Sequence, residues 1–240
     1  DVKYGTPALV KGCESGKLTL KDAKVLVEEL EQDPSEKKDG NSLVYVMAYN
    51  NGGDDVLTYL RSKGGGTEGE MQLGRFDGLK KKYKNEFPKG TPLVCACEKG
   101  RVEDVEGMIR GARAAGMDVT AMVSEVGTRS YGASGWTPLM MAACYEHSTI
   151  IEILLQCNAD TATTNNDGFN ALHMAACYNK TTTTTVQLLL NNMKLEDINH
   201  ISRYSGRTPL DYCYELNNSS IKQQLIDLIR QKGGKRKSEL

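Results

Sequence analysis

The stretch GWTPLMMAAC, from Gly135 to Cys144, is followed 33 positions later by a close copy, GFNALHMAAC, from Gly168 to Cys177. A catalytic motif is normally present once, because one site performs the reaction. A string that recurs at a fixed period instead typically marks a structural unit that stacks on its own copies. The repetition therefore predicts a scaffold built from repeated units.

The Thr-Pro-Leu pattern of this stretch occurs elsewhere in the chain in weaker form. GTPALVKGC begins at Gly5, GTPLVCACEKG at Gly90 and GRTPLDYCYE at Gly206, and a degraded copy beginning NSLVYVMAYNN lies near Asn41. The copies start near residues 6, 42, 91, 137, 170 and 208. Their succession predicts a single repeat array over residues 1–231, followed by a basic C-terminal tail at 232–240.

Each copy combines a helix start with two short helices. A Thr or Asn side chain before the first helix can cap free backbone N–H groups, and Pro at the first helical position loses no hydrogen bond. The paired alanines, such as Ala142 and Ala143, keep this helix thin, so neighbouring helices can approach closely. In STIIEILLQC, residues 148–157, the Ile and Leu side chains fall on one helical face. Because no helix pair can bury both of its faces alone, the pairs must stack.

These residues resemble the repeat pattern of the ankyrin-repeat family. Copy four matches it at Gly135, Thr137, Pro138, Leu139, Ala142, Ala143, Ile150, Ile151, Leu154, Leu155, Ala159 and Asp160. Copy five carries the family-type histidine, His173, and Asn158 stands where the family has Gly, a mild departure because Asn tolerates a left-handed cap. The resemblance implies an all-α repeat solenoid of stacked helix-turn-helix repeats with projecting β-hairpin loops.

Two insertions interrupt the period, at residues 64–89 and 117–134. The first joins a flexible, Gly-rich lead to a basic segment, Lys80 to Lys84. The second lengthens the connection between copies three and four, where the resemblance implies a finger-like β-hairpin, here longer than usual. Long loops on a rigid scaffold often carry function, although added loop length is also tolerated at little entropic cost.

The composition argues against several classes of function. The 30 basic and 31 acidic residues balance, so the chain as a whole has no field that attracts nucleic acid or an acidic membrane. No apolar run approaches the roughly 20 residues of a membrane-spanning helix. The 7 cysteines are odd in number and mostly follow the Thr-Pro-like starts. This usage is typical of free thiols in a reducing compartment, either the cytoplasm or an organelle reached with a targeting peptide that is then lost.

Two glycine-rich strings resemble phosphate-binding motifs without the required context. GGGTEG, residues 64–69, satisfies G-x-G-x-x-G but follows an expected helix rather than a strand. GCESGK, residues 12–17, is one residue too short between its glycines and is followed by Leu18 instead of Ser or Thr. The cysteines and histidines lack zinc-site spacing. We therefore predict no enzyme activity, no cofactor and no metal site.

The resemblance also implies where a partner would bind, at the hairpin tips and on the exposed side of the first helices. The sequence has aromatic and arginine side chains at these positions, and such residues are frequent anchors of interfaces. The predicted partner-binding residues are Arg129, Tyr131, Trp136, Tyr145, Phe169, Tyr178, Tyr204 and Arg207. The alternative is that the aromatic side chains pack against neighbouring hairpins and only stiffen the stack.

The expected function is a non-catalytic scaffold or adaptor that binds another protein through its concave groove and hairpin loops. Alone the chain would be a monomer, or it would form part of a larger complex. Nucleic acid is not the expected partner. Two other functions stay open: a structural subunit of a multiprotein assembly, and a binder of phosphorylated or nucleic-acid ligands through Lys80 to Lys84 and the tail.

Overall fold

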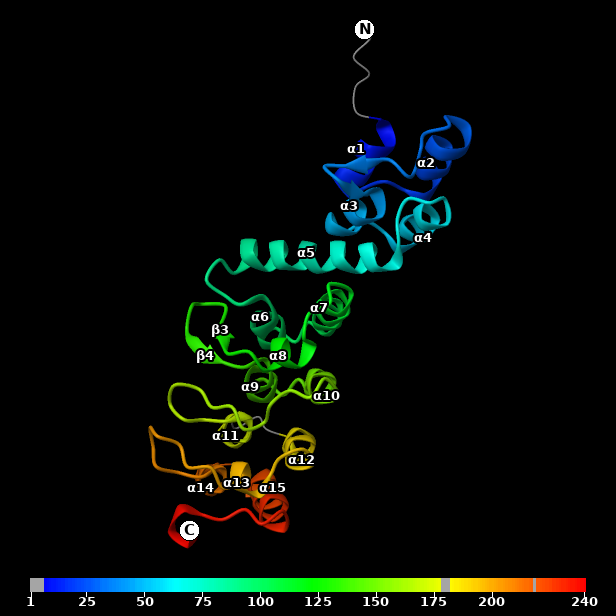
Figure 1. The fold of residues 1–240 in the computed structure, drawn as a ribbon. Helices are drawn as coiled ribbons and strands as arrows, with labels where there is room; N and C mark the ends of the chain where they lie inside the picture. The colour runs from blue at the N-terminus through cyan, green and yellow to red at the C-terminus, as the bar shows by residue number, and fades with distance from the viewer. Residues whose placement is uncertain (1–6, 178–181, 218) are drawn as a thin grey trace. The chain divides into compact units, whose positions relative to one another are not determined.

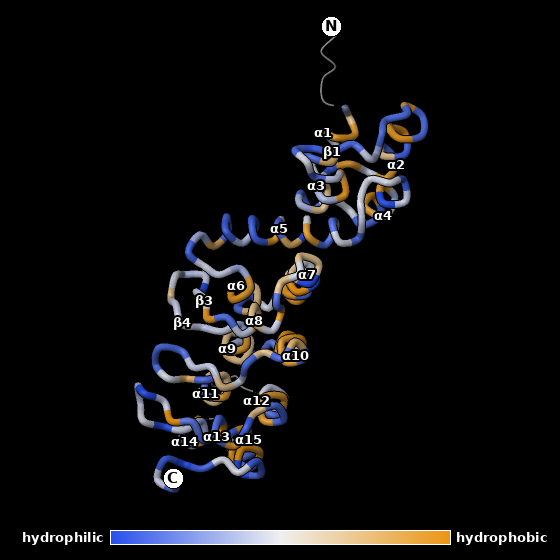
Figure 2. The backbone as a smooth tube through the Cα atoms, in the orientation of Figure 1, coloured by the Kyte–Doolittle hydropathy of each residue, from blue (hydrophilic) through white to orange (hydrophobic). Residues whose placement is uncertain are grey.

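The computed structural model describes residues 7–177, 182–217 and 219–240, and it confirms the all-α repeat solenoid (Figure 1). The chain forms two compact units, one from Asp1–Lys82 with Glu106–Asp118 and the other from Tyr83–Val105 with Val119–Leu240. Hydrophobic residues are concentrated in the helices and the connecting loops are mostly hydrophilic (Figure 2). Each unit is described separately below, and the single array over residues 1–231 stays a prediction.

The second unit contains the best-matched repeats. Their first helices are α6 (Pro92–Glu98), α9 (Pro138–Cys144), α11 (Ala171–Cys177) and α14 (Pro209–Glu215). These helices pack on one another in that order. Ala142, Ala143, Ala175 and Ala176 are buried between them, which confirms that the paired alanines allow close approach.

Side-chain caps of the expected kind are present at α9 and α14, whereas the Thr91 side chain makes no capping hydrogen bond at α6. The Thr137 hydroxyl accepts a hydrogen bond from the backbone N–H of Met140 at 3.1 Å. Thr208 and Asp211 form a reciprocal capping box at the start of α14. Pro occupies the first helical position of α6, α9 and α14, where its missing N–H costs nothing.

The second helices of these repeats also form a packed series. They are α10 (Ser148–Gln156), α12 (Thr183–Leu190) and α15 (Ser219–Gln231), with the short α13 (Leu195–Ile198) before α14 and the 3₁₀ turn η2 (Lys237–Glu239) after α15. Helix α12 contacts both α10 and α15. Ile150, Ile151 and Leu154 are buried, as their spacing predicts. Asn158 has a φ of 59°, so it takes the left-handed conformation for which the family uses Gly.

The first unit begins with two helix pairs and a small hairpin, which precede α5 (Glu68–Glu86). Its elements are α1 (Ala8–Ser15), α2 (Leu20–Lys24) continuing as a π-helical turn (Val25–Glu29), β1 (Lys37–Lys38), β2 (Asn41–Ser42), α3 (Leu43–Tyr49) and α4 (Asp54–Ser62). Strands β1 and β2 are antiparallel. The core of the unit includes Leu9, Leu43, Met47, Leu57 and Leu60, all at most 1 % exposed.

The first insertion is mostly a helix instead of a loop, which corrects the expectation from sequence. Helix α5 (Glu68–Glu86) is 19 residues long. A β-carbon at Gly74 or Gly78 would collide with the carbonyl oxygen of Tyr45 or Tyr49 on α3. Because Gly74 and Gly78 have no side chain, the α5 backbone can lie directly on α3.

The same helix also packs closely on α7 (Val102–Ala114) within the first unit. A β-carbon at Gly107 would lie 2.9 Å from Leu79, and one at Gly111 would collide with Phe76. Two glycine pairs, each spaced by four residues, therefore hold α5 against both α3 and α7.

The second insertion divides into a helix and a hairpin. Helix α8 (Val119–Ser124) comes first, followed by β3 (Gly127–Thr128) and β4 (Ser134–Trp136). The strands are antiparallel, with Gly127 opposite Trp136 and an irregular step before Thr128. The Thr91 backbone N–H donates to the Thr128 carbonyl at 2.9 Å, and the Thr128 N–H donates to the Thr91 hydroxyl at 2.9 Å. These bonds attach the hairpin to the start of α6.

The basic tail folds back onto α14. The Asp211 carboxylate accepts a hydrogen bond from Arg236 Nε at 2.9 Å and another from the Lys237 backbone N–H at 2.9 Å. The Thr208 hydroxyl donates to the Lys235 carbonyl at 2.8 Å. Asp211 therefore serves both the cap of α14 and the attachment of the tail.

Candidate partner-binding surface

Five residues of the second unit form a compact group beside the β3–β4 hairpin, here named the finger cluster: Glu98, Arg129, Tyr131, Trp136 and Tyr145. Arg129 lies at its centre. Its guanidinium carbon is 4.5 Å from the ring centroid of Tyr131, 4.7 Å from that of Trp136 and 5.8 Å from that of Tyr145. Its Nη2 also donates a hydrogen bond to the Tyr145 hydroxyl at 2.5 Å. The structure thus brings together four of the eight predicted residues.

Glu98, which was not among the predicted site residues, neutralises this buried arginine. Its side chain is 3 % exposed, and Oε1 lies 3.9 Å from Arg129 Nη2. Its carboxylate accepts hydrogen bonds from the Ser130 backbone N–H at 2.9 Å and from the Ser130 hydroxyl at 3.0 Å. A buried carboxylate requires such partners, because desolvation without them is costly. The loop of the hairpin is therefore fixed to the last turn of α6.

The predicted residues differ in how far they reach solvent. Tyr204 is 79 % exposed, Tyr131 63 % and Tyr145 41 %, whereas Arg129 is only 7 % exposed. Trp136 and Phe169 are half-buried, and Arg207 is exposed. Tyr178 lies outside the described residues. The rings thus both pack within the hairpin region and present faces to solvent.

A second aromatic group lies at the start of the last repeat. Phe169 meets Tyr212 edge to face, with the ring centroids 5.7 Å apart. The Arg207 guanidinium lies 5.7 Å from the Tyr212 ring and pairs with Glu215 at 2.8 Å. This group holds two of the predicted residues, Phe169 and Arg207, and Tyr204 stands apart from both groups on the loop between α13 and α14.

His173 of α11 is structural. It is fully buried, its Nδ1 is 2.8 Å from the Asn170 side-chain oxygen and its Nε2 is 3.2 Å from the Arg207 carbonyl. Burial lowers the pKa of His173 to about 4, so the imidazole is neutral near pH 7. A neutral imidazole can donate from one nitrogen and accept at the other. With Nε2 as the donor to the Arg207 carbonyl, the ring links two repeats, and Nδ1 accepts from the Asn170 backbone N–H at 3.4 Å.

The cysteines are suited to packing. All seven lie in the described residues, none of them forms a disulfide, and six are buried. Burial raises the pKa of Cys177 to about 12 and that of Cys213 to about 12, which removes the thiolate that nucleophilic or metal chemistry requires. Within the described ranges, no group of three His, Cys, Asp or Glu residues could hold a metal ion. None of the described helices is long and apolar enough to cross a membrane.

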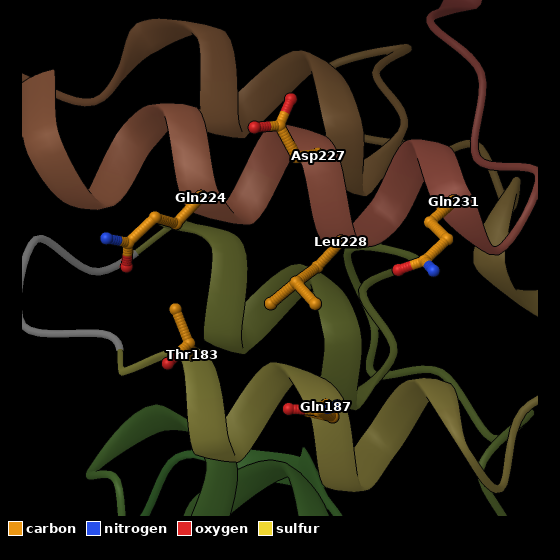
Figure 3. Close-up of a pocket in the computed structure, with 6 residues that line it drawn as sticks. All are labelled: Thr183, Gln187, Gln224, Asp227, Leu228 and Gln231. Atoms are coloured by element: carbon orange, nitrogen blue, oxygen red, sulfur yellow. The ribbon is translucent and has the colours of Figure 1, made fainter.

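An open groove of about 510 Å³ lies between α12 and α15 (Figure 3). It is lined by Thr183, Gln187, Gln224, Asp227, Leu228 and Gln231. Three of these six residues are glutamines, and Asp227 is the single charged one. None of the seven predicted partner-binding residues that the structure describes lines this groove.

Two lysines of α5 already have interaction partners among neighbouring side chains. Lys80 pairs with Asp77 at 2.8 Å and lies over the Phe76 ring at 4.3 Å. Lys81 lies over the Tyr49 ring at 4.8 Å. Contacts of this kind direct the ammonium groups to the protein's own side chains.

A family model described as ankyrin repeats, in three copies, matches residues 46–165, 115–200 and 157–234. These overlapping matches cover both the finger cluster and the aromatic group of the last repeat. A search of curated proteins finds no match.

Proposed function

Because the chain belongs to the ankyrin-repeat family, whose repeats are in general protein–protein interaction modules, we propose that it is a non-catalytic scaffold or adaptor. It binds a partner protein through the exposed side of its first helices and the hairpin loops. The finger cluster forms the centre of this surface. Phe169, Tyr204 and Arg207 extend it toward the last repeat.

The exposure of tyrosine on the hairpin side carries the proposal. Eight large apolar or aromatic side chains are exposed among the described residues, and three of them are Tyr131, Tyr145 and Tyr204. A tyrosine offers a large contact area with few rotatable bonds, which suits an interface anchor. Arg129 and Glu98 hold the hairpin in place, and Arg129 bonds the Tyr145 hydroxyl, so the ring of Tyr145 is positioned before a partner arrives. Such preorganisation lowers the entropic cost of binding.

The contacts of α5 and of the tail favour this function over binding through the basic patch. Lys80 and Lys81 have partners on their own unit, and Arg236 is paired with Asp211. A nucleic-acid surface requires several cationic groups free to contact phosphates. These residues therefore offer fewer available cationic groups than the number of basic residues in the sequence suggests.

An affinity capture from the native extract tests the proposal. The full chain is compared with a Trp136→Ala, Tyr145→Ala variant and with a Gln224→Ala, Gln231→Ala control that changes the groove between α12 and α15. All three must show the same helical circular dichroism. We expect one protein to be retained by the original and by the control but not by the finger variant. Equal retention by all three would refute the proposed surface, and a partner lost only with the control would place binding on the second helices.

A further inference from the structure

The finger cluster is flanked by exposed cationic side chains. A β-carbon at Gly132 would lie 3.2 Å from Lys89 Cδ, so the stem of Lys89 runs beside the tip of the hairpin. Lys99 Nζ lies 3.7 Å from Glu98 Oε1 and 5.3 Å from the Phe87 ring. Lys89 and Lys99 are both exposed. Glu98, the one carboxylate of the cluster, therefore faces two cationic groups, Arg129 and Lys99, and Lys89 adds a third positive charge beside the hairpin tip.

Glu98 has little capacity left for a further cation. Its side chain is almost fully buried, and its carboxylate already accepts two hydrogen bonds from Ser130 and faces Arg129 and Lys99. A basic group of a partner would meet three positive charges and no accessible carboxylate of the cluster. The surface beside the hairpin therefore favours an anion.

Arg129 retains unused hydrogen-bonding capacity. Its side chain is 9 % exposed, and within the described part of the chain its Nε is buried without a hydrogen-bond partner. A guanidinium carries five N–H donors, and an unpaired buried donor is unfavourable. An additional acceptor oxygen at this arginine would remove that deficit. The Tyr131 ring, which covers the guanidinium and is 63 % exposed, is the side chain that would move to admit it.

We propose that the finger cluster binds an acidic side chain in an extended segment of the partner protein. A carboxylate oxygen faces Arg129, Lys89 and Lys99 lie on either side, and the rings of Tyr131, Trp136 and Tyr145 contact the neighbouring residues of the segment. This inference rests on the proposed function and specifies the chemistry of the partner. Three cations beside three aromatic rings suit a short acidic peptide better than a nucleic-acid strand, whose binding requires an extended series of phosphate contacts.

Selection of random linear peptides displayed on phage against the immobilised full chain tests the inference. We expect the enriched peptides to contain Asp or Glu beside an apolar residue. A synthetic copy of one such peptide is then titrated against the protein. We expect its Kd to rise about tenfold in a Lys89→Gln, Lys99→Gln variant and about thirtyfold in Arg129→Gln. Lys194→Gln removes one positive charge from a side chain that is 81 % exposed, and this control leaves the Kd unchanged.

The lysine variant keeps the test valid if Arg129→Gln fails to fold, because Lys89 and Lys99 are exposed. Enrichment of peptides without Asp or Glu, no enrichment, or a Kd insensitive to Lys89 and Lys99 would overturn the inference. So would a single-stranded RNA homopolymer that displaces the peptide and binds more tightly. Neutral peptides that still depend on Trp136 and Tyr145 would overturn only the acidic specificity and leave the proposed function standing. Binding that is independent of all these residues would refute both.

Discussion

Replacing Gly74 by Ala separates two opposing effects on helix α5. Alanine in a helix interior is favoured over glycine by about 1 kcal/mol. At this position, however, the added methyl group collides with the Tyr45 carbonyl and lies 3.1 Å from the Ala48 β-carbon. Backbone atoms cannot rotate away, so the overpacking costs about 1–3 kcal/mol. We expect a net loss of about 1 kcal/mol in the free energy of unfolding for Gly74→Ala.

Gly78 lies one turn further along and collides in the same way with Tyr49. The Gly74→Ala, Gly78→Ala variant is expected to lose about 2 kcal/mol, with deviation from additivity because the two sites share one interface. Gly69 provides the matched control in the same helix, because its nearest neighbour is the Thr67 hydroxyl at 3.8 Å. Gly69→Ala should therefore stabilise the chain by a few tenths of a kcal/mol or more.

Hydrogen exchange measured on peptides covering α3 and α5 is the suitable assay, because unfolding of a repeat protein need not be two-state. Faster exchange in both helices is expected for the changes at Gly74 and Gly78, and unchanged or slower exchange for Gly69→Ala. If Gly74→Ala protected α5 as well as Gly69→Ala does, the close contact between α5 and α3 would be refuted.

Three further perturbations have expected outcomes. The pKa of buried His173 is about 4, below its ordinary value of 6.5. As the pH falls from 6.5 toward 4, His173 is protonated in the unfolded chain but not in the folded one, so the free energy of unfolding should fall by up to about 3 kcal/mol. In urea titrations, this pH-dependent loss of stability should be absent in His173→Gln and present in His147→Gln. Equal pH dependence of the two variants would contradict the assignment to His173. Asn158→Gly should raise the thermal midpoint slightly and Asn158→Val should lower it, because position 158 has a φ of 59°. A higher midpoint for valine would count against that backbone assignment. Asp211→Asn should lower the free energy of unfolding by about 1–2 kcal/mol through loss of the capping box and of the Arg236 pair. Arg236→Gln removes the pair and the contact of Arg236 with the Tyr214 ring but leaves the capping box. It should cost less in the same denaturation assay, and an equal or larger loss would contradict a contribution from the cap.

The repeat helices could be predicted because their determinants are local. Thr137 and Pro138 start α9, paired alanines permit close packing, and Asn158 closes the repeat with a left-handed residue. Each of these effects acts within a few residues, so it can be recognised in a single copy. Helix α5 was missed for the opposite reason. Its glycines lower helix propensity, and their favourable effect arises only from contact with α3.

The finger cluster could be predicted in composition but not in arrangement. The aromatic and arginine positions follow from the repeat pattern. The burial of Arg129 depends on Glu98, which lies 31 residues earlier in the chain and approaches only when the hairpin folds back onto α6. A pairing between distant residues leaves no mark in either local sequence. The same holds for Asp211, whose bond to Arg236 requires the tail to return to α14.

The position of Trp136 has a practical consequence. It is the single tryptophan of the chain, and its ring lies against the Arg129 guanidinium beside the hairpin. Light at the red edge of the aromatic absorption band excites tryptophan selectively, so the intrinsic emission of the whole protein then originates at this one place. Docking of a ligand on the hairpin, or displacement of Arg129, would change the colour and intensity of that emission. The protein therefore contains its own optical reporter of events at the hairpin, without any attached dye.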